Sequence, residues 1–340
     1  MSERRTLAIL AAAALVSTGL AVLALRQQAQ EGAPQFAPSE FLPGFAAQVK
    51  NAARIHIVSH DGAFDIAYTP DKGWVLPERG NYPADFDEVR HTLIGLAALE
   101  TIEPKTARAD WLHYVGLETP PKGNGVLIQV KAASGRELAS LIMGNMESIG
   151  DPNGAAGLFV RRPNETQSWL ARAVFVPHGA PSDWMLLNVL NVDAARLKDV
   201  TIAPAAGKSF TLARAHMSDV NFAVSPPLGN ASPQVLNAIT TAITGFTASD
   251  AHSAAQLDFR KSVHVTAHTF DGLSLSMDVV ASGPDIWARL SAAAGPDAVP
   301  GIAKEARDVN ARAGGWAYKL PPDKGRLLMA TEAMLGGTGP

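Results

Sequence analysis

Residues 54–68 read Arg-Ile-His-Ile-Val-Ser-His-Asp-Gly-Ala-Phe-Asp-Ile-Ala-Tyr. Apolar and polar residues alternate on both sides of the Asp61-Gly62 pair, as at Ile55 before it and Phe64 after it. A period of two places alternate side chains on one face of a strand, and an Asp-Gly pair favours a tight turn. The stretch therefore predicts a β-hairpin with one face buried.

A third short strand and a helix follow this hairpin. A Pro-Asp-Lys-Gly turn leads into the apolar residues 74–76, which predict the strand. Pro83 then precedes a segment in which Asp85 can cap a helix and Glu88, three residues later, can complete a capping box. Apolar residues recur at helical spacing over 89–99, so this helix is expected to lie on a sheet.

Further strands and one short helix complete a first unit. The strands are expected at residues 126–130, 137–143, 157–161 and 174–176, and the helix at residues 183–190.

The same order of elements begins again near residue 200. Ile202 stands 145 positions after Ile57, and Val235 stands 146 positions after Val89 in the predicted helix. Two further correspondences match residues 127–144 with 263–280 and residues 157–160 with 315–318, and an added helix is expected at 303–313. The sequence therefore predicts an α+β fold of two related units, each a mainly antiparallel sheet with a packed helix, at residues 51–200 and 201–335.

An apolar segment precedes these units. Residues 7–25 contain 19 positions without a charge, which as a helix would span about 28 Å, close to the thickness of a bilayer core. Residues 1–6 carry two arginines, so the positive-inside rule predicts a single transmembrane helix with the body outside the cytoplasm and 27–50 as a linker. A cleaved signal peptide is the alternative, because small residues near position 24 allow cleavage, and the arginine pair is also compatible with twin-arginine export.

Composition excludes several classes of protein. The 340 residues carry a formal charge of −3, and the part after residue 26 retains 26 basic and 31 acidic residues, a net charge of −5. This balance argues against a nucleic-acid partner. The absence of cysteine excludes disulfides, thiolate metal sites and cysteine nucleophiles.

Several motifs occur in an order that resembles a known bacterial family. They are Gly73-Trp74-Val75-Leu76, Tyr82-Pro83-Ala84-Asp85, Tyr114-Val115-Gly116-Leu117-Glu118-Thr119-Pro120, Ile142-Met143-Gly144 and Gly157-Leu158-Phe159-Val160-Arg161. With the N-terminal apolar segment, they resemble the family called domain of unknown function 4340, over roughly residues 50–330. The resemblance implies a periplasmic accessory protein, anchored in the bacterial inner membrane beside the permease and ATPase subunits of an ABC-type exporter. It implies no catalytic residues. The second half departs from the pattern, with Phe222-Ala223-Val224 in place of Trp74-Val75-Leu76.

The sequence offers no pattern that indicates catalysis, a metal or a cofactor. The histidine pairs 56/60 and 264/268 lie in alternating segments, where four residues span about 13 Å, too far for one ion. No serine stands in a Gly-x-Ser-x-Gly elbow, and residues 123–125 precede a strand, whereas phosphate-binding glycines follow one. Asp85 and Asp87 could form a carboxylate pair for glycoside chemistry, but capping of the helix that begins there explains both more simply.

The tryptophans are the remaining candidates for a binding surface. Stacking on sugar rings is one interpretation, and packing in the core is the more common one. Trp111 and Trp184 stand beside loops and are expected to be the exposed pair, and residues 111–121 are rich in aromatics and proline. We therefore expect a partner contact that involves Trp111, Tyr114, Pro120 and Trp184.

Three functions follow as hypotheses. The first is a non-enzymatic accessory or scaffold subunit of an ABC-type export system, and the second is a periplasmic module that binds glycan or peptide. The third, an unrecognised hydrolase, would need a pocket in which Ser or Asp and His converge within about 3 Å.

Overall fold

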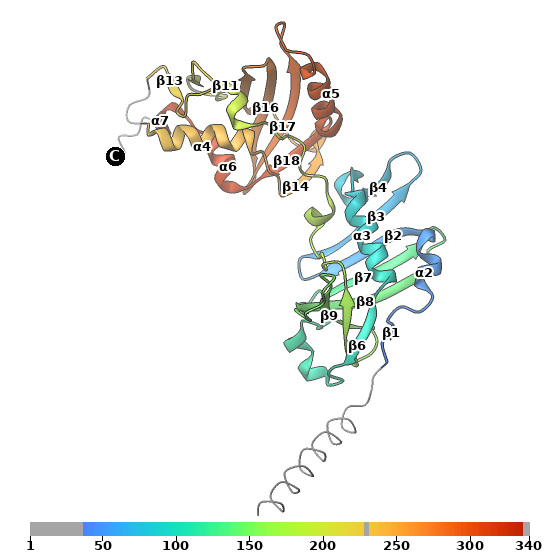
Figure 1. The fold of residues 1–340 in the computed structure, drawn as a ribbon. Helices are drawn as coiled ribbons and strands as arrows, with labels where there is room; N and C mark the ends of the chain where they lie inside the picture. Colours follow the sequence, from blue (N-terminus) through green and yellow to red (C-terminus); the bar gives the residue numbers. More distant parts are fainter. Residues whose placement is uncertain (1–36, 228–230, 336–340) are drawn as a thin grey trace, which may run out of the picture.

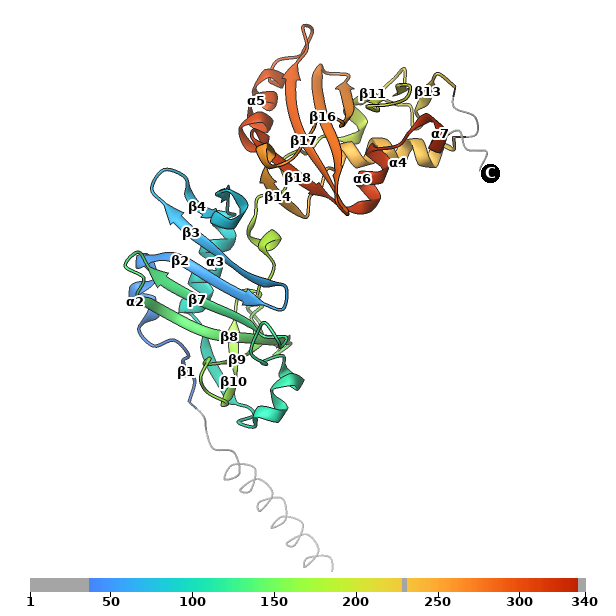
Figure 2. The same cartoon turned by 180° about the vertical axis from the view of Figure 1, so that it is seen from behind.

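The computed structural model describes residues 37–227 and 231–335, which form two antiparallel sheets with helices packed against them (Figure 1). The first sheet has ten strands in the order β1-β6-β10-β9-β8-β7-β2-β3-β4-β5. The second has eight strands in the order β13-β12-β11-β15-β16-β17-β18-β14. Figure 2 shows the two sheets as separate lobes that meet near β14. An α+β fold is therefore confirmed.

The first lobe contains the following strands: β1 (Ser39–Glu40), β2 (Ala52–Ser59), β3 (Gly62–Thr69), β4 (Gly73–Leu76), β5 (Tyr82–Pro83), β6 (Glu100–Pro104), β7 (Val126–Ala132), β8 (Glu137–Glu147), β9 (Ala156–Arg161) and β10 (Ser168–Ala173). Its helices are α2 (Phe45–Gln48) and α3 (Phe86–Ala97), with the 3₁₀ helices η1 (Val49–Asn51), η2 (Pro77–Arg79) and η3 (Ala109–Val115). The 3₁₀ helices η4 (Pro181–Trp184) and η5 (Ala194–Arg196) lie in the connection to the second lobe.

The second lobe contains the remaining strands: β11 (Leu197–Ala203), β12 (Phe210–Ala213), β13 (Ala223–Ser225), β14 (Asp250–Ser253), β15 (Val263–Thr269), β16 (Leu273–Ser282), β17 (Asp285–Ala294) and β18 (Trp316–Leu320). Its helices are α4 (Pro233–Thr244), α5 (Ile302–Ala313), α6 (Pro322–Leu328) and α7 (Glu332–Leu335), with the 3₁₀ helix η6 (Ala254–Gln256).

The two sheets share an order of eight strands. Without β1 and β5, the first sheet runs β6-β10-β9-β8-β7-β2-β3-β4, and the second runs β14-β18-β17-β16-β15-β11-β12-β13 in the same relative order. The counterpart of β9 is therefore β17, and that of β10 is β18. The match of residues 157–160 with 315–318 was wrong by one strand, because the sequence interpretation omitted both β10 and β17.

The hairpin that opens the first lobe is confirmed. Ile57 lies opposite Phe64, and alternate residues of β2 are buried. Helix α3 begins as predicted, since the Asp85 carboxylate accepts hydrogen bonds from two amides of the first turn. The predicted capping box does not form, because the Asp85 amide donates to the Trp184 carbonyl at 2.8 Å and the Glu88 carboxylate accepts from the Thr92 hydroxyl.

Two predicted elements in the connection between the lobes were wrong. Residues 174–176 are not a strand, although Val174 and Val176 are exposed on either side of the buried Phe175. Phe175 packs against Gly95 of α3. Its burial between two exposed valines therefore imitates the pattern of a strand, although these residues do not pair with a neighbouring strand. The helix expected at 183–190 is only the short η4, because the chain beyond it extends past β5 and pairs Met185 with Ala84.

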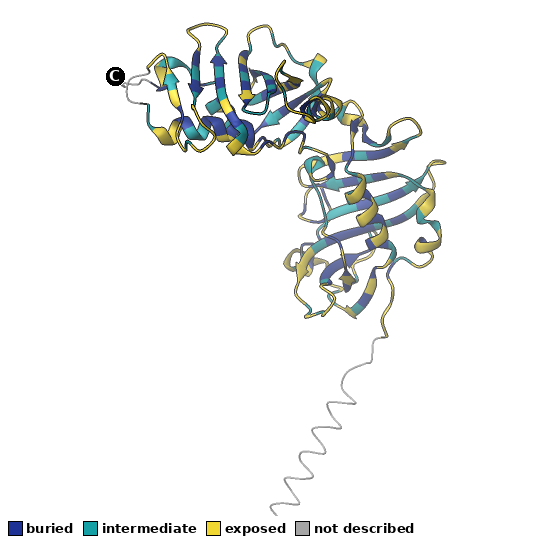
Figure 3. Ribbon diagram, turned by 45° about the horizontal axis from the view of Figure 1, so that its top comes forward, coloured by how far each residue is buried: buried dark blue, intermediate teal, exposed yellow. Residues whose placement is uncertain are grey.

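One large core runs through both lobes. Helix α3 buries Val89, Leu93 and Leu96 against the first sheet, and α4 buries Ile239 and Ile243 against the second. In Figure 3 the strands beneath α3 are largely buried, whereas the outward side of this helix is exposed. The stripe of α3 is the one that helical spacing predicts, whereas Val235 of α4, which was matched with Val89, is 39 % exposed.

Direct contacts join the lobes. Strand β14 contacts β5 and η2, and Arg79 Nε donates to Asp250 Oδ1 at 2.8 Å. The Tyr82 ring lies 4.9 Å from the Trp316 ring and 6.3 Å from the Tyr318 ring, both in edge-on geometry. Burial raises the pKa of Tyr82 above its usual value, consistent with a dry joint.

The predicted membrane segment at 7–25 lies outside the described residues, as do residues 1–6. Within 37–227 and 231–335, no helix is both long enough and apolar enough to cross a bilayer. The later part of the predicted linker 27–50 belongs to the first lobe, because Phe41 and Phe45 are buried in its core.

Candidate partner-contact site

Of the four residues that were expected to contact a partner, two are exposed and two are buried. Trp111 and Tyr114 are exposed, with 47 % and 71 % of their surface accessible. Pro120 is buried, and Trp184 is only 1 % exposed. The expectation that Trp184 would be exposed was therefore wrong, and two of the four side chains are available to a partner.

Trp184 is buried in the main core and is held there by one contact near in sequence and one distant. Its indole Nε1 donates to the His178 carbonyl at 3.4 Å, and its backbone carbonyl accepts from the Asp85 amide at the start of α3. The ring belongs to the main core. Trp184 thus anchors the connection between the lobes to the first lobe.

The exposed pair lies on an ordered loop. We call residues 105–116, which follow β6 and include η3, the aromatic loop. The rings of Trp111 and Tyr114 approach to 6.5 Å in edge-on geometry, and the His113 ring lies 3.8 Å from that of Tyr114. Gly116 ends η3 with φ 69°, a left-handed conformation that glycine adopts readily.

The inner side of the aromatic loop rests on a small separate core. Leu112 packs in a cluster with Ile142 of β8 and Phe159 of β9. Gly144 allows β8 to approach closely, because a Cβ there would lie 2.2 Å from the Val115 carbonyl oxygen. Two exposed aromatic rings are thus held on a backbone that is packed from behind.

Arg161 fastens the segment that follows the aromatic loop. This arginine ends β9, is 3 % exposed, and donates from Nε to the Leu117 carbonyl at 2.7 Å and from Nη2 to the Thr119 hydroxyl at 2.6 Å. Its Nη1 donates to three further carbonyls, those of residues 162, 163 and 165. Burial lowers the pKa of Arg161 from its usual value.

No pattern in the sequence indicated this role of Arg161. An arginine at the end of a strand is more often exposed, and its partners here are neutral oxygens rather than a nearby carboxylate. The residue stands in one of the motifs that carry the family resemblance, Gly157–Arg161, where its function was not apparent.

Charges on the aromatic loop are largely compensated. The Arg108 guanidinium pairs with Asp110 at 2.7 Å and lies 4.7 Å over the Trp111 ring. The hydrogen bonds from Arg108 lower the pKa of Asp110, and Lys105 pairs with Glu103. The loop therefore presents aromatic surface without an excess of either charge.

Histidines on the open sheet faces pair with aspartates across strands. His56 Nδ1 lies 2.7 Å from Asp65 Oδ1, and His268 Nδ1 lies 2.6 Å from Asp199 Oδ1. Within 37–227 and 231–335, no group of three or more His, Asp or Glu side chains could hold a metal ion.

One of these pairs extends to a serine. His264 Nδ1 lies 2.9 Å from Asp278 Oδ1, and its Nε2 lies 3.5 Å from Ser276 Oγ. The Ser–His distance exceeds the 2.6–3.2 Å or so typical of a nucleophile and its base. Strands β15 and β16 each pair with a neighbouring strand on both sides. Their backbone amides therefore form the hydrogen bonds of the sheet rather than an oxyanion hole. Ser276 and His264 therefore lie farther apart than the roughly 3 Å convergence expected of a hydrolase.

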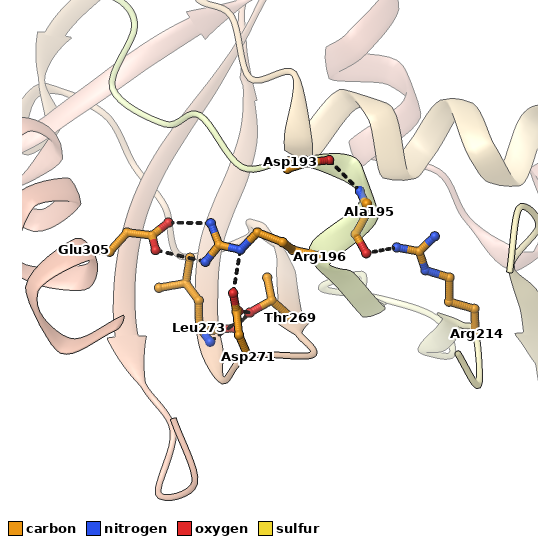
Figure 4. Close-up of polar contacts among 8 residues, drawn as sticks. All are labelled: Asp193, Ala195, Arg196, Arg214, Thr269, Asp271, Leu273 and Glu305. Carbon is orange, nitrogen blue, oxygen red and sulfur yellow. Dashed lines mark hydrogen bonds and ion pairs between the residues drawn. The ribbon is translucent and has the colours of Figure 1, made fainter. Parts of the chain in front are cut away.

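The strongest ion-pair cluster has a structural role (Figure 4). Arg196 in η5 holds both Glu305 oxygens at 2.9 Å and Asp271 Oδ2 at 2.6 Å. The hydrogen bonds that Arg196 donates to Glu305 are the main reason that the pKa of Arg196 is raised. Arg214 donates to the Ala195 carbonyl in the same turn. The cluster fixes the start of the second lobe to α5 and to the β15–β16 turn.

Comparison with known proteins gives one match. A family described as Domain of unknown function (DUF4340) matches residues 74–260, which is more than half of the chain. The matched region begins in β4 and ends before β15, so it includes the aromatic loop and the connection between the lobes. No curated protein and no solved structure matches the chain.

Proposed function

The chain belongs to the DUF4340 family, and from this premise we propose that it is a non-enzymatic accessory or scaffold subunit of an ABC-type export system. In this proposal residues 7–25 anchor it in the bacterial inner membrane, and the two lobes lie in the periplasm. The ATPase subunit supplies the energy for export, and this chain binds the permease.

One observation carries the proposal: the aromatic loop lies at the end of the first lobe at which the described part of the chain begins. Ser39 of β1 pairs with Thr101 of β6 in antiparallel register. Ala37 and Pro38 therefore run alongside the residues that follow Thr101, toward the aromatic loop. Both segments lie at the lower end of the first lobe in Figures 1 and 2. An ordered, exposed aromatic surface on the membrane side suits a tethered subunit.

The proposal is tested by purification from membranes. We expect the tagged full-length chain, solubilised in mild detergent, to recover a permease and an ATPase subunit of the ABC type. An unrelated single-pass membrane protein with the same tag, expressed at the same level, is the control. Recovery of neither subunit under conditions in which the chain itself is intact would contradict the proposal.

The alternative is a periplasmic module that binds glycan or peptide, and one feature favours it. An open hollow of about 510 Å³ lies between Leu42, the outer face of β7 and β8 at Gln129 and Ser140, and the β9–β10 loop at Arg162 and Glu165. Its lining is mostly polar, and its volume is within the range of ligand sites. A rise in the melting temperature with glycan or peptide fragments, lost in Gln129→Leu, would favour this alternative.

We also infer that the two lobes are copies of one unit. The support is the shared order of eight strands, together with a helix between equivalent strands: α3 between β4 and β6, and α4 between β13 and β14. A superposition of the equivalent strands that placed α3 and α4 on opposite faces would contradict this inference.

A further inference from the structure

We propose that the aromatic loop docks on the lipid–water interface of the membrane and holds the first lobe against the bilayer. This inference rests on the proposed function, because it requires the anchor at residues 7–25. It assigns the contact to the lipid rather than to the permease.

The reach of the chain permits this contact. The described chain begins at Ala37, so residues 26–36 separate it from the predicted membrane segment. A chain of this length spans at most about 40 Å when fully extended. Since β1 runs antiparallel to β6, Ala37 lies at the same end of the sheet as Pro104, where the aromatic loop begins. The loop therefore lies at the end of the sheet at which the described chain begins.

The exposed side chains suit the interface of a bilayer. Trp and Tyr are enriched at both membrane–water interfaces, because each has an apolar ring and a polar group. Trp111 and Tyr114 are the exposed aromatic pair of this loop, and their backbone is held by the packing of Leu112 and Gly144. Because the loop is already ordered, little conformational entropy is lost when the two rings insert into the interface.

Charge does not drive the contact. Arg108 is paired with Asp110, and the portion of the chain after residue 26 has a net charge of −5. A surface of this kind has no electrostatic attraction to anionic headgroups. We therefore expect docking on zwitterionic lipid and little dependence on salt.

A weak contact between the aromatic loop and lipid is sufficient for docking, because the chain is already tethered to the membrane. A stable protein interface buries about 800 Å² on each partner, whereas the aromatic loop offers two rings within a polar rim of Arg108, Asp110 and His113. A short tether raises the effective concentration of the loop at the membrane to the millimolar range. The bilayer is present wherever the anchor is inserted, which favours lipid over a particular protein surface.

The test uses the full-length chain in phosphatidylcholine vesicles without any partner protein. Because the sequence contains no cysteine, Tyr114→Cys accepts a single environment-sensitive fluorophore. The matched control is Val220→Cys, whose position is 81 % exposed in the second lobe. Quenching is measured with iodide in the water and with nitroxide-labelled lipid, and flotation with the vesicles reports the anchor.

At position 114 we expect a shift of emission to shorter wavelength, quenching by the labelled lipid and loss of iodide quenching. At position 220 we expect full iodide quenching. Adding Trp111→Ser to Tyr114→Cys should restore iodide access. A chain that floats while position 114 stays as accessible as position 220 overturns the docking and leaves the proposed function standing. A chain that does not float overturns both. Protection that appears only with added permease assigns the contact to protein and also overturns lipid docking.

Discussion

Replacement of Arg161 by methionine provides a direct test of how the segment after the aromatic loop is held. Methionine is unbranched and has no hydrogen-bond donor, so the change removes every bond from the guanidinium while filling the space of the aliphatic part of the arginine side chain. The carbonyl of Leu117 and the hydroxyl of Thr119 lose their donors, at 2.7 Å and 2.6 Å in the native protein. Three carbonyls of the β9–β10 loop lose theirs as well.

The magnitude follows from these bonds and from burial. A hydrogen bond from a charged donor contributes about 1.5–3 kcal/mol, and each buried acceptor left without a donor costs about 1–3 kcal/mol. Removing Arg161 also relieves the cost of burying its charge, which is the cause of its lowered pKa. The acceptors remain buried after the change, so the loss exceeds the relief. We expect Arg161→Met to lower the free energy of unfolding by about 3 kcal/mol.

Urea unfolding of the full-length chain in detergent, followed by circular dichroism, measures this change. With an m-value of about 2–3 kcal/mol/M, the midpoint should fall by about 1 M. Arg162→Met is the matched control, because Arg162 is next in sequence and half-exposed, and its one hydrogen bond to the Phe41 carbonyl is 3.1 Å long. It should cost less than about 1 kcal/mol. Equal midpoints for the two variants would refute the role assigned to Arg161.

Three further changes test other parts of the fold. Gly95→Ala should destabilise the protein by about 1–3 kcal/mol in a melting experiment, because the new Cβ would lie 2.4 Å from the Phe175 ring. A double-mutant cycle with Arg79→Ala and Asp250→Ala should give a coupling energy of about 1 kcal/mol across the joint, and a value of zero would remove this ion pair from the joint. Asp278 is partly buried, which raises its pKa, but hydrogen bonds from a histidine and an arginine outweigh this and hold the pKa below its usual value. Its stabilisation is therefore present above about pH 4 and is lost as the pH falls further, so Asp278→Asn should weaken the loss of stability on acidification in urea titrations.

Local patterns in the sequence were sufficient to predict those elements whose residues alone indicate a buried face or a helix start. The alternation at Ile55 and Phe64 identified the first hairpin, and Asp85 marked the start of α3. Strand β17 was missed because its buried positions include Ala288 and Ala292, and alanine has little preference for strands. The order of strands in a sheet depends on pairings between residues distant in sequence. The last correspondence between the two halves, which matched residues 157–160 with 315–318, was therefore wrong by one strand.

The exposure of large side chains was harder to predict. Trp111 was correctly expected at the surface because it stands beside a loop, whereas Trp184 also stands beside a loop and is buried. The difference arises from the first lobe, where the Trp184 ring joins the main core and the Asp85 amide, distant in sequence, donates to the Trp184 carbonyl. A single sequence contains no signal for such contacts.

The joint between the lobes also protects a sheet edge. Strand β5 ends the first sheet with two residues, one of which is Pro83, which has no amide to offer to another strand. Strand β14 ends the second sheet and contacts β5, with the Tyr82 ring buried against Trp316. Separation of the lobes would expose both edges and this buried ring to water. The two lobes are therefore expected to move as one body, so that a contact made by the aromatic loop at the membrane also sets the direction in which the second lobe points.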